Sequence, residues 1–235
     1  MDKKNLLKNF RSFLNFWIPE KNITFLHKLR LNELIEIRKF LPNKKELLEI
    51  GAGSGFQAKV LESWGFKVKA VDLDISNYRN NKLFDIKLYD GVNLPFDDSK
   101  FSIIFSSNVF EHIDDINQML KEIARVSKKN ATIILLMPSS TWRIWTSITD
   151  FIKHWHSRKH GVHSSNFIDE IYYFSRSWWM KKLSHIDYNL EYVSSNNIFY
   201  TGNSLLGDLL PIYFRKKMAI FMGSSCNVYI LKKIN

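Results

Sequence analysis

The chain has a single cysteine among its 235 residues, and this scarcity limits how the fold can be held together. Cys226 alone excludes a disulfide within the chain and is typical of a protein from a reducing compartment. No apolar run approaches the ~18–20 residues that a membrane-spanning helix needs. Because no small-residue cleavage site follows the basic first residues, we expect no signal peptide and a cytoplasmic protein. The sequence also has no internal repeat and no low-complexity tract.

Acidic residues are scarce in the two flanks of the chain, whereas charges of both signs nearly balance in the middle. The net charge is +11, with +7 in residues 1–45, −2 in residues 46–150 and +6 in residues 151–235. Basic flanks attract nucleic acid, an anionic membrane surface or a phosphorylated substrate, and the charge alone does not choose among them. The length suits one α/β domain with additions, large enough to bury a sizeable core.

A strand, a glycine turn and a helix follow one another at the start of the middle region. Residues 46–50 are mainly apolar, which indicates a short buried strand, and residues 51–55 form a turn without bulk. Helical spacing of apolar residues runs from about Ser54 to Trp64. This order is the opening of a nucleotide-binding α/β unit, in which glycines permit positive φ and close approach of a ligand.

The spacing of residues around this turn limits which nucleotide could bind there. The sixth position counted from Gly51 is Phe56, where the dinucleotide fingerprint requires a small residue. A second strand, Lys67 to Val71, leads into Asp72, which lies 21 positions after Gly51. A carboxylate at that place accepts hydrogen bonds from ribose hydroxyls, so Asp72 predicts a nucleoside without naming it. The alternative is that Asp72 only caps a turn.

Three more strands are predicted after this unit, at residues 86–89, 101–106 and 131–137. The motifs E-x-G-x-G-x-G, V-D-x-D, D-G-x-x-L-P-F and S-x-V-x-E-H occur in order from Glu49 to His112. In this order the chain resembles the class I S-adenosylmethionine-dependent methyltransferases, in particular the small-molecule branch similar to methyltransferase type 11. The resemblance covers about residues 45–138.

The resemblance implies a fold, a cofactor and a set of binding residues. The fold is a Rossmann-like seven-stranded mixed α/β sheet with helices on both faces, and the cofactor is S-adenosylmethionine. Glu49 would hold the ammonium group, Asp72 the ribose, and Asp90 the adenine amino group. The other implied cofactor contacts are Gly51, Ala52, Gly53, Leu73, Gly91 and Asn108. A surface carboxylate is the alternative reading of Glu49, and Asp74 fits a helix cap better than a ligand.

Residues 1–45 are expected to be an N-terminal helical extension. Apolar residues recur at helical spacing between Leu6 and Ile18, with lysines and an arginine largely off that stripe. Such a basic amphipathic helix can lie on an anionic membrane through residues 3–18, or pack over the cleft of its own domain. A second helix is predicted at about residues 25–41.

The chain departs from the family plan after residue 138. Residues 46–138 form the predicted cofactor core, and residues 139–175 form an insertion rich in Trp and His that is placed to roof the acceptor site. Residues 176–235 are expected to complete the same sheet. The elements predicted there are a helix at 177–186, a strand at 190–193, a helical stretch at 205–222 and a strand at 227–231.

Three histidines are candidates for a catalytic base. They are His112, which follows the fourth strand, and His160 and His163 in the insertion. His156 and His160 are four residues apart, as in some zinc sites, but no cysteine is near and Gly161 interrupts the helix. We therefore expect no metal site in this protein.

The predicted activity is methyl transfer to an oxygen of a small anionic, sugar or glycolipid acceptor. An RNA methyltransferase and an inactive methyltransferase-like binding protein are the alternatives. Scattered basic residues and the lack of an Asn-Pro-Pro-Tyr-like motif argue against a nucleic acid partner. Phe56 and the lack of a Tyr-x-x-x-Lys pair disfavour a nicotinamide-dependent oxidoreductase.

Overall fold

The computed structural model describes residues 17–18, 22–43, 45–74, 82–184 and 187–234. The amphipathic helix predicted between Leu6 and Ile18 lies almost entirely outside the described residues. In the part of the chain that is described, no helix is long and apolar enough to cross a membrane.

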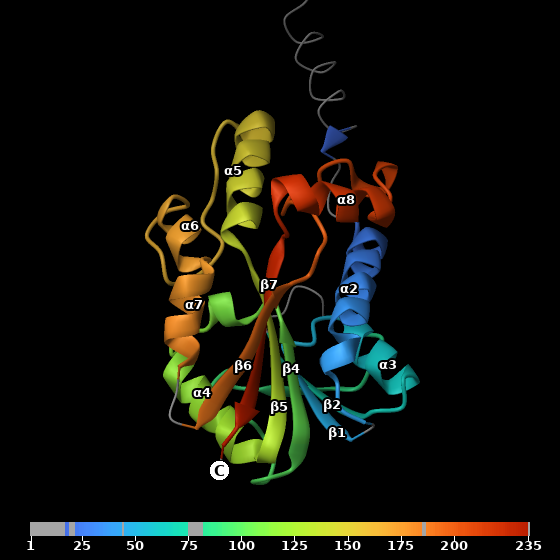
Figure 1. The fold of residues 1–235 in the computed structure, drawn as a ribbon, viewed down its shortest axis with the longest axis vertical. Helices are drawn as coiled ribbons and strands as arrows, with labels where there is room; N and C mark the ends of the chain where they lie inside the picture. The colour runs from blue at the N-terminus through green and yellow to red at the C-terminus, as the bar shows by residue number, and fades with distance from the viewer. Residues whose placement is uncertain (1–16, 19–21, 44, 75–81, 185–186, 235) are drawn as a thin grey trace, which may run out of the picture.

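A seven-stranded sheet with the order β3-β2-β1-β4-β5-β7-β6 forms the centre of the molecule (Figure 1). The first five strands are parallel, and β7 runs antiparallel between β5 and β6. The sheet is therefore mixed, which confirms the predicted fold class. The strands are β1 (Glu46–Ile50), β2 (Lys67–Leu73), β3 (Ile86–Tyr89), β4 (Phe101–Ser107), β5 (Ser127–Pro138), β6 (Tyr188–Ser195) and β7 (Cys226–Lys233).

Helices cover both faces of the sheet (Figure 1). One face packs against α4 and α7 and the other against α2 and α3, and each interface is a separate apolar core. The α-helices are α2 (Ile23–Ile37), α3 (Phe56–Ser63), α4 (Ile116–Val126), α5 (Ser140–His154), α6 (Asp169–Tyr173), α7 (Arg176–Leu183) and α8 (Ile212–Met222). Short 3₁₀ helices are η1 (Arg38–Phe40), η3 (Phe110–His112) and η4 (Gly207–Leu209).

Two predicted helices have different bounds in the structure. The helix predicted from residue 25 begins at Ile23, because the Asn22 side chain accepts hydrogen bonds from the first-turn amides and caps it. The helical stretch predicted at 205–222 was wrong for its first part, since α8 begins only after Pro211. Before it, the chain wraps the buried Arg215, whose guanidinium donates to the carbonyls of Leu205, Gly207 and Leu210.

The fifth strand is longer than the apolar pattern predicts. It begins at Ser127 rather than residue 131, and its pairing with β4 shifts register between Phe101 and Ile103. Asn130 has a φ of 60° at this irregularity. The polar segment 127–130 gives no strand signal because a β-bulge, and not apolar alternation, joins it to the sheet.

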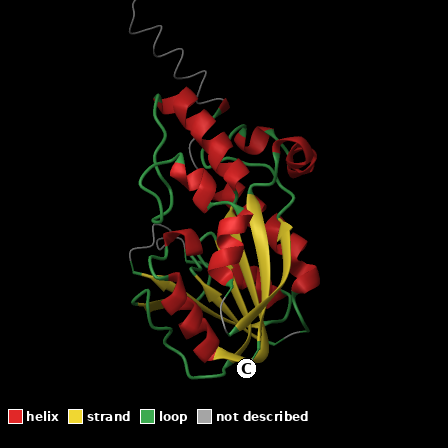
Figure 2. Cartoon of the chain, turned by 60° about the vertical axis from the view of Figure 1, so that its left-hand side comes forward, coloured by secondary structure: helices red, strands yellow, loops and turns green. Residues whose placement is uncertain are grey.

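The insertion at residues 139–175 consists of α5, a long connection and α6, and it lies beyond the carboxyl ends of the parallel strands (Figure 2). Residues 176–235 add α7, β6, α8 and β7 to the same sheet. Ligands of parallel α/β sheets bind at the carboxyl ends of the strands. The insertion and the turns after β1, β2 and β4 therefore share the edge where a ligand is expected.

Candidate functional site

The glycine turn after β1 is packed against the segment that follows β4. Gly51 has a φ of +77°, and a Cβ added there would lie 2.2 Å from a methyl carbon of Val109. The amides of Gly51 and Ala52 donate to the carbonyl of Val71 at 2.9 and 3.1 Å. Only glycine meets both the left-handed φ and the contact with Val109, so backbone rather than side chain faces this part of the edge.

Asp72 stands at the end of β2, beside the turn. One carboxylate oxygen accepts from the amide of Gly53 at 2.7 Å, and the other accepts from the amide of Leu73 at 2.8 Å. These bonds fix the carboxylate at the carboxyl edge of the sheet, next to the glycines. Its predicted contact with a ribose remains a prediction, as do the cofactor contacts of Gly53 and Leu73.

Glu49 is buried in β1 with 2% of its surface exposed, and its Oε2 has no hydrogen-bond partner among the described residues. Burial, and then the charge of Asp72, raise the pKa of Glu49 to about 8, while the amide of Ala58 acts in the opposite direction. A buried carboxyl group of this kind is stabilised in its ionised form by a cation placed beside it. The predicted role of Glu49, to hold an ammonium group, is consistent with this environment.

Asp90 and Gly91 form the turn after β3, on the other side of Asp72. The Asp90 carboxylate accepts from the amides of Val92 and Asn93, and these bonds hold the pKa of Asp90 below its usual range. A Cβ added to Gly91 would lie 3.1 Å from the Leu73 side chain, so these two residues are neighbours. Asp90 is exposed, and its carboxylate already accepts hydrogen bonds from the amides of its own turn. Its predicted contact with adenine therefore stays a prediction.

Helix α2 covers the glycine turn from the N-terminal side. The ring of His27 stacks on Phe56 with centroids 4.1 Å apart, and His27 Nε2 lies 3.3 Å from Ser54 Oγ. One turn later, Arg30 Nη1 lies 2.7 Å from the Asn108 side-chain oxygen in the amide orientation that satisfies both groups. Arg30 therefore brings a guanidinium to the carboxyl end of β4. Sequence analysis missed it, since no motif marks α2.

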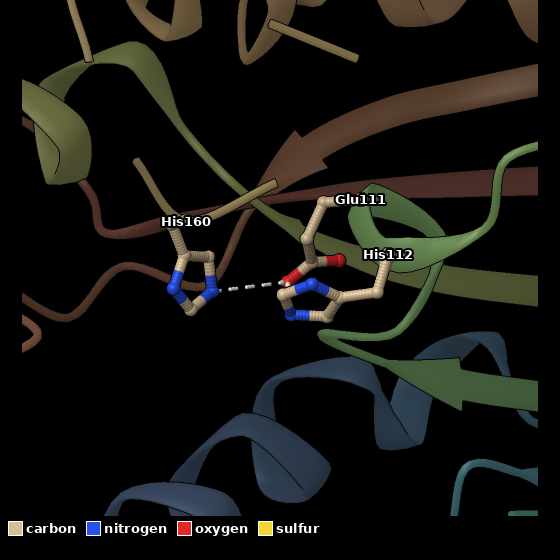
Figure 3. A group of neighbouring side chains, drawn as sticks. All are labelled: Glu111, His112 and His160. Carbon is tan, nitrogen blue, oxygen red and sulfur yellow. Dashed lines mark ion pairs between the residues drawn. The ribbon is translucent and has the colours of Figure 1, made fainter. Parts of the chain in front are cut away.

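A second group of polar side chains lies just beyond β4. Glu111 is fully buried, with neither carboxylate oxygen hydrogen-bonded among the described residues. His112 Nε2 lies 3.9 Å and His160 Nε2 3.8 Å from the same Glu111 oxygen (Figure 3). The structure thus brings together two of the three predicted base candidates around a buried carboxylate that sequence analysis had used only as part of a motif.

His160 reaches this group because its loop is fastened on both sides. Glu170 accepts hydrogen bonds from the amides of His160 and Gly161, and it pairs with Arg143 at 3.3 Å in a buried ion pair. The amide of Val162 donates to the Glu111 carbonyl at 3.0 Å. A Cβ on Gly161 would lie 2.9 Å from that carbonyl, so this approach also needs a glycine.

His163, the third predicted base, lies apart from the other two. Its ring packs on Trp178 with centroids 5.1 Å apart, and its Nε2 is buried without a hydrogen-bond partner among the described residues. Burial, and then the charge of Lys182, lower the pKa of His163. Burial also lowers the pKa of His112, against the charge of Glu111. The base role of His163 stays a prediction, in a position that differs from that of His112 and His160.

Comparison with known proteins gives the family. Residues 48–135 match the family model described as "Methyltransferase domain". This segment is a methyltransferase domain of the class I, S-adenosylmethionine-dependent kind. Its cofactor is accordingly S-adenosylmethionine, and the matched residues span β1 to β5, with the glycine turn and Glu111.

Curated relatives are similar to the chain in sequence, and solved structures are similar to it in fold. The chain is 26% identical over 64% of its length to an uncharacterized protein of Methanocaldococcus jannaschii, covering 70% of that protein. It is 26% identical over 57% of its length to the ubiquinone biosynthesis O-methyltransferase of Rickettsia typhi, covering 60% of that protein. The fold of a methyltransferase from Aquifex aeolicus matches 88% of this chain and 93% of that one, with a TM-score of 0.56 at 17% identity. A putative methyltransferase of Listeria monocytogenes matches 88% and 98%, with a TM-score of 0.60 at 14% identity.

Proposed function

We propose that this methyltransferase transfers the methyl group of S-adenosylmethionine to a hydroxyl oxygen of a small acceptor. The observation that carries the proposal is the position of the Glu111, His112 and His160 side chains. Val109, which packs against Gly51 of the glycine turn, precedes Glu111 by two residues. A methyl donor held at the turn and an acceptor held at the histidines would therefore be neighbours at one edge of the sheet.

The cofactor lies, in this proposal, across the ends of β1, β2 and β4. Glu49 holds the ammonium group, Asp72 the ribose, and Arg30 the carboxylate of the methionine portion. The unpartnered oxygen of Glu49 and the position of Arg30 beside Asn108 support the first and the last of these roles. Leu73 and Gly91 would border the adenine, since they are in contact with one another.

Transfer from a sulfonium is an in-line displacement at the methyl carbon. The C–S bond breaks as the C–O bond forms, and the acceptor hydroxyl loses its proton. Holding the oxygen about 3–3.5 Å from the methyl carbon supplies most of the rate enhancement. A hydroxyl is a poor nucleophile until its proton leaves, and a group that assists this step contributes typically 10²–10⁴-fold. His112 and His160 are placed to interact with that hydroxyl.

Oxygen as the accepting atom is supported by the relative from Rickettsia typhi, whose name states an O-methyltransferase. An acceptor with an apolar portion, such as a glycolipid, is supported by exposed apolar side chains beyond the same end of the sheet, where α5 and α8 lie (Figure 1). These exposed residues are Ile148, Phe151, Ile152 and Trp155 at α5, and Phe214, Ile220 and Phe221 on α8.

The test is calorimetric titration with S-adenosylmethionine, S-adenosylhomocysteine and NADH, followed by transfer of labelled methyl to panels of sugar, glycolipid and RNA acceptors. We expect both sulfur compounds to bind, NADH not to bind, and label to enter a hydroxylated small molecule as an ether. Label in RNA, or binding of the cofactor without transfer to any hydroxyl acceptor, would contradict the proposal.

A further inference from the structure

We propose that Glu111, His112 and His160 bind a divalent transition-metal ion of the Zn²⁺ class. Each residue offers one donor atom, and these three atoms lie within 4.8 Å of one another. Two imidazole nitrogens and a carboxylate oxygen are a ligand set that suits zinc and its neighbours in the first transition row better than Mg²⁺ or Ca²⁺.

The distances are those of donors that need only a small movement to share an ion. Zn–N and Zn–O bonds of about 2.0–2.2 Å place two donors of a tetrahedral ion about 3.4 Å apart. The imidazole nitrogens of His112 and His160 lie 3.9 and 3.8 Å from the Glu111 oxygen, and that of His160 points toward it (Figure 3). Each histidine would close its distance to Glu111 by about half an ångström, and the two imidazole donors, within 4.8 Å of one another, would also approach each other.

Among the described residues, Glu111 has no partner besides the two histidines that explains its burial. Its side chain is fully buried, and neither oxygen accepts a hydrogen bond within the described part of the chain. Burying a carboxylate without compensation is costly, and such groups are normally paired or coordinate a metal. The nearby buried Arg143 pairs with Glu170 instead. A bound cation supplies the compensation that Glu111 lacks.

The supporting contacts are of the kind that orient metal ligands. Glu170 and the carbonyl of Glu111 fix the loop that carries His160, through the amides of residues 160–162. Trp142 lies against the His160 ring, with centroids 4.9 Å apart. These contacts hold the His160 loop and ring in place before a metal arrives.

Three protein ligands leave a coordination position open. The side chains of His112 and His160 are 44% and 36% exposed, so the open position faces outward from the buried Glu111. An acceptor hydroxyl bound there would lose its proton more readily, because a metal ion lowers the pKa of a bound oxygen. This catalytic role rests on the methyl transfer proposed above, whereas metal binding itself does not.

The experiment uses the full chain without a histidine tag, freed of metal with a chelator and titrated with Zn²⁺ by calorimetry. A parallel titration with Co²⁺ reports the ligand geometry through its visible absorption. We expect one ion per chain, and affinity reduced at least about tenfold in His160→Ala and Glu111→Gln. His156→Ala is the matched control, because His156 is an exposed histidine of the same connection outside the group, and its affinity should equal that of wild type.

Lack of Zn²⁺ binding by the wild type, or equal binding by wild type and His160→Ala, would overturn the inference. Because Glu111 is buried, the Glu111→Gln result counts only if the circular dichroism of this variant matches that of the wild type. If it does not match, the result for His160→Ala, a substitution on a loop, decides the test. The same samples are titrated with S-adenosylhomocysteine. Lack of Zn²⁺ binding by a wild type that still binds the cofactor and transfers methyl would refute the metal site and leave the proposed function standing. Zn²⁺ binding without methyl transfer would support the metal site and contradict the proposed function.

Discussion

The glycine turn and the group formed by Glu111, His112 and His160 occupy the same edge of the sheet but are built differently. The turn is local: Glu49 to Asp72 are consecutive strand, turn, helix and strand, and glycine backbone shapes the surface. The group of Glu111, His112 and His160 joins η3 to a loop 48 residues after His112, and its polar surface is formed by side chains. The shape of the glycine turn follows from the strand–turn–helix unit itself, whereas the histidine group forms only because the insertion brings His160 to Glu111.

This difference predicts separable functions. Changes in the turn should act on the cofactor, and changes in the histidine group should act on the acceptor. The following substitutions test that division, beginning with the largest expected effect.

Gly51→Ala should abolish measurable cofactor binding. The left-handed φ costs an alanine about 1–2 kcal/mol, and its Cβ would displace Val109, whose methyl carbon lies 2.2 Å away. Titration with S-adenosylhomocysteine measures the loss. Gly65→Ala is the control, because Gly65 also has a positive φ, 91°, but precedes β2, at the opposite end of the strand from Asp72. Normal binding by Gly51→Ala would show that the turn does not face the cofactor.

His160→Ala should lower turnover by about 10²-fold or more, because the assistance to hydroxyl deprotonation is lost. Cofactor affinity should stay within about twofold of wild type, since the turn is untouched. Steady-state kinetics with the labelled methyl donor measures the first and calorimetry the second, with His156→Ala as the control. A cofactor affinity that falls together with turnover would mean that the two regions are not separable.

Asp72→Asn should weaken cofactor binding about 10–100-fold. A hydrogen bond to a charged group contributes about 1.5–3 kcal/mol, and the neutral amide replaces one acceptor oxygen by a donor. Asp97→Asn, at an exposed carboxylate in the loop before β4, should bind like wild type. Equal affinities for Asp72→Asn and wild type would reject the placement of the ribose at the end of β2.

Glu49→Gln should change how stability depends on pH. The pKa of Glu49 is about 8 in the folded protein against an ordinary value of 4.5, so between these values the folded state keeps a proton that the unfolded chain has lost. The free energy of unfolding of the wild type therefore falls as pH rises through this window, and it levels off above about pH 8. Glu49→Gln lacks this loss and should gain stability relative to wild type from pH 5 to pH 9.

Urea unfolding at several pH values measures this gain, and Glu62→Gln, exposed on α3, is the control that should follow the wild type. Parallel curves for Glu49→Gln and wild type would mean that Glu49 is ionised and already compensated in the folded protein. The same substitution should also weaken cofactor binding, because the ammonium group loses its carboxylate partner.

The two regions also differ in how far the sequence predicts them. Strand alternation, glycines and the spacing to Asp72 are local signals, and they placed β1 to β4 and the turn closely. The meeting of His160 with Glu111 depends on Glu170, Arg143 and the docked loop, which no periodicity reports. Arg30 was missed for the same reason, since its relation to Asn108 exists only once α2 has packed on the sheet. The start of α8 at Ile212, after Pro211, was also missed, because the bonds from the buried Arg215 to the carbonyls of the preceding segment give no periodic signal.

The most direct test of the division is one titration of S-adenosylhomocysteine into three proteins: wild type, Asp72→Asn and His160→Ala. The account predicts that wild type and His160→Ala bind alike, and that Asp72→Asn binds about 10–100-fold more weakly. Binding weakened by His160→Ala and unchanged by Asp72→Asn would contradict it, as would a wild type that does not bind the compound.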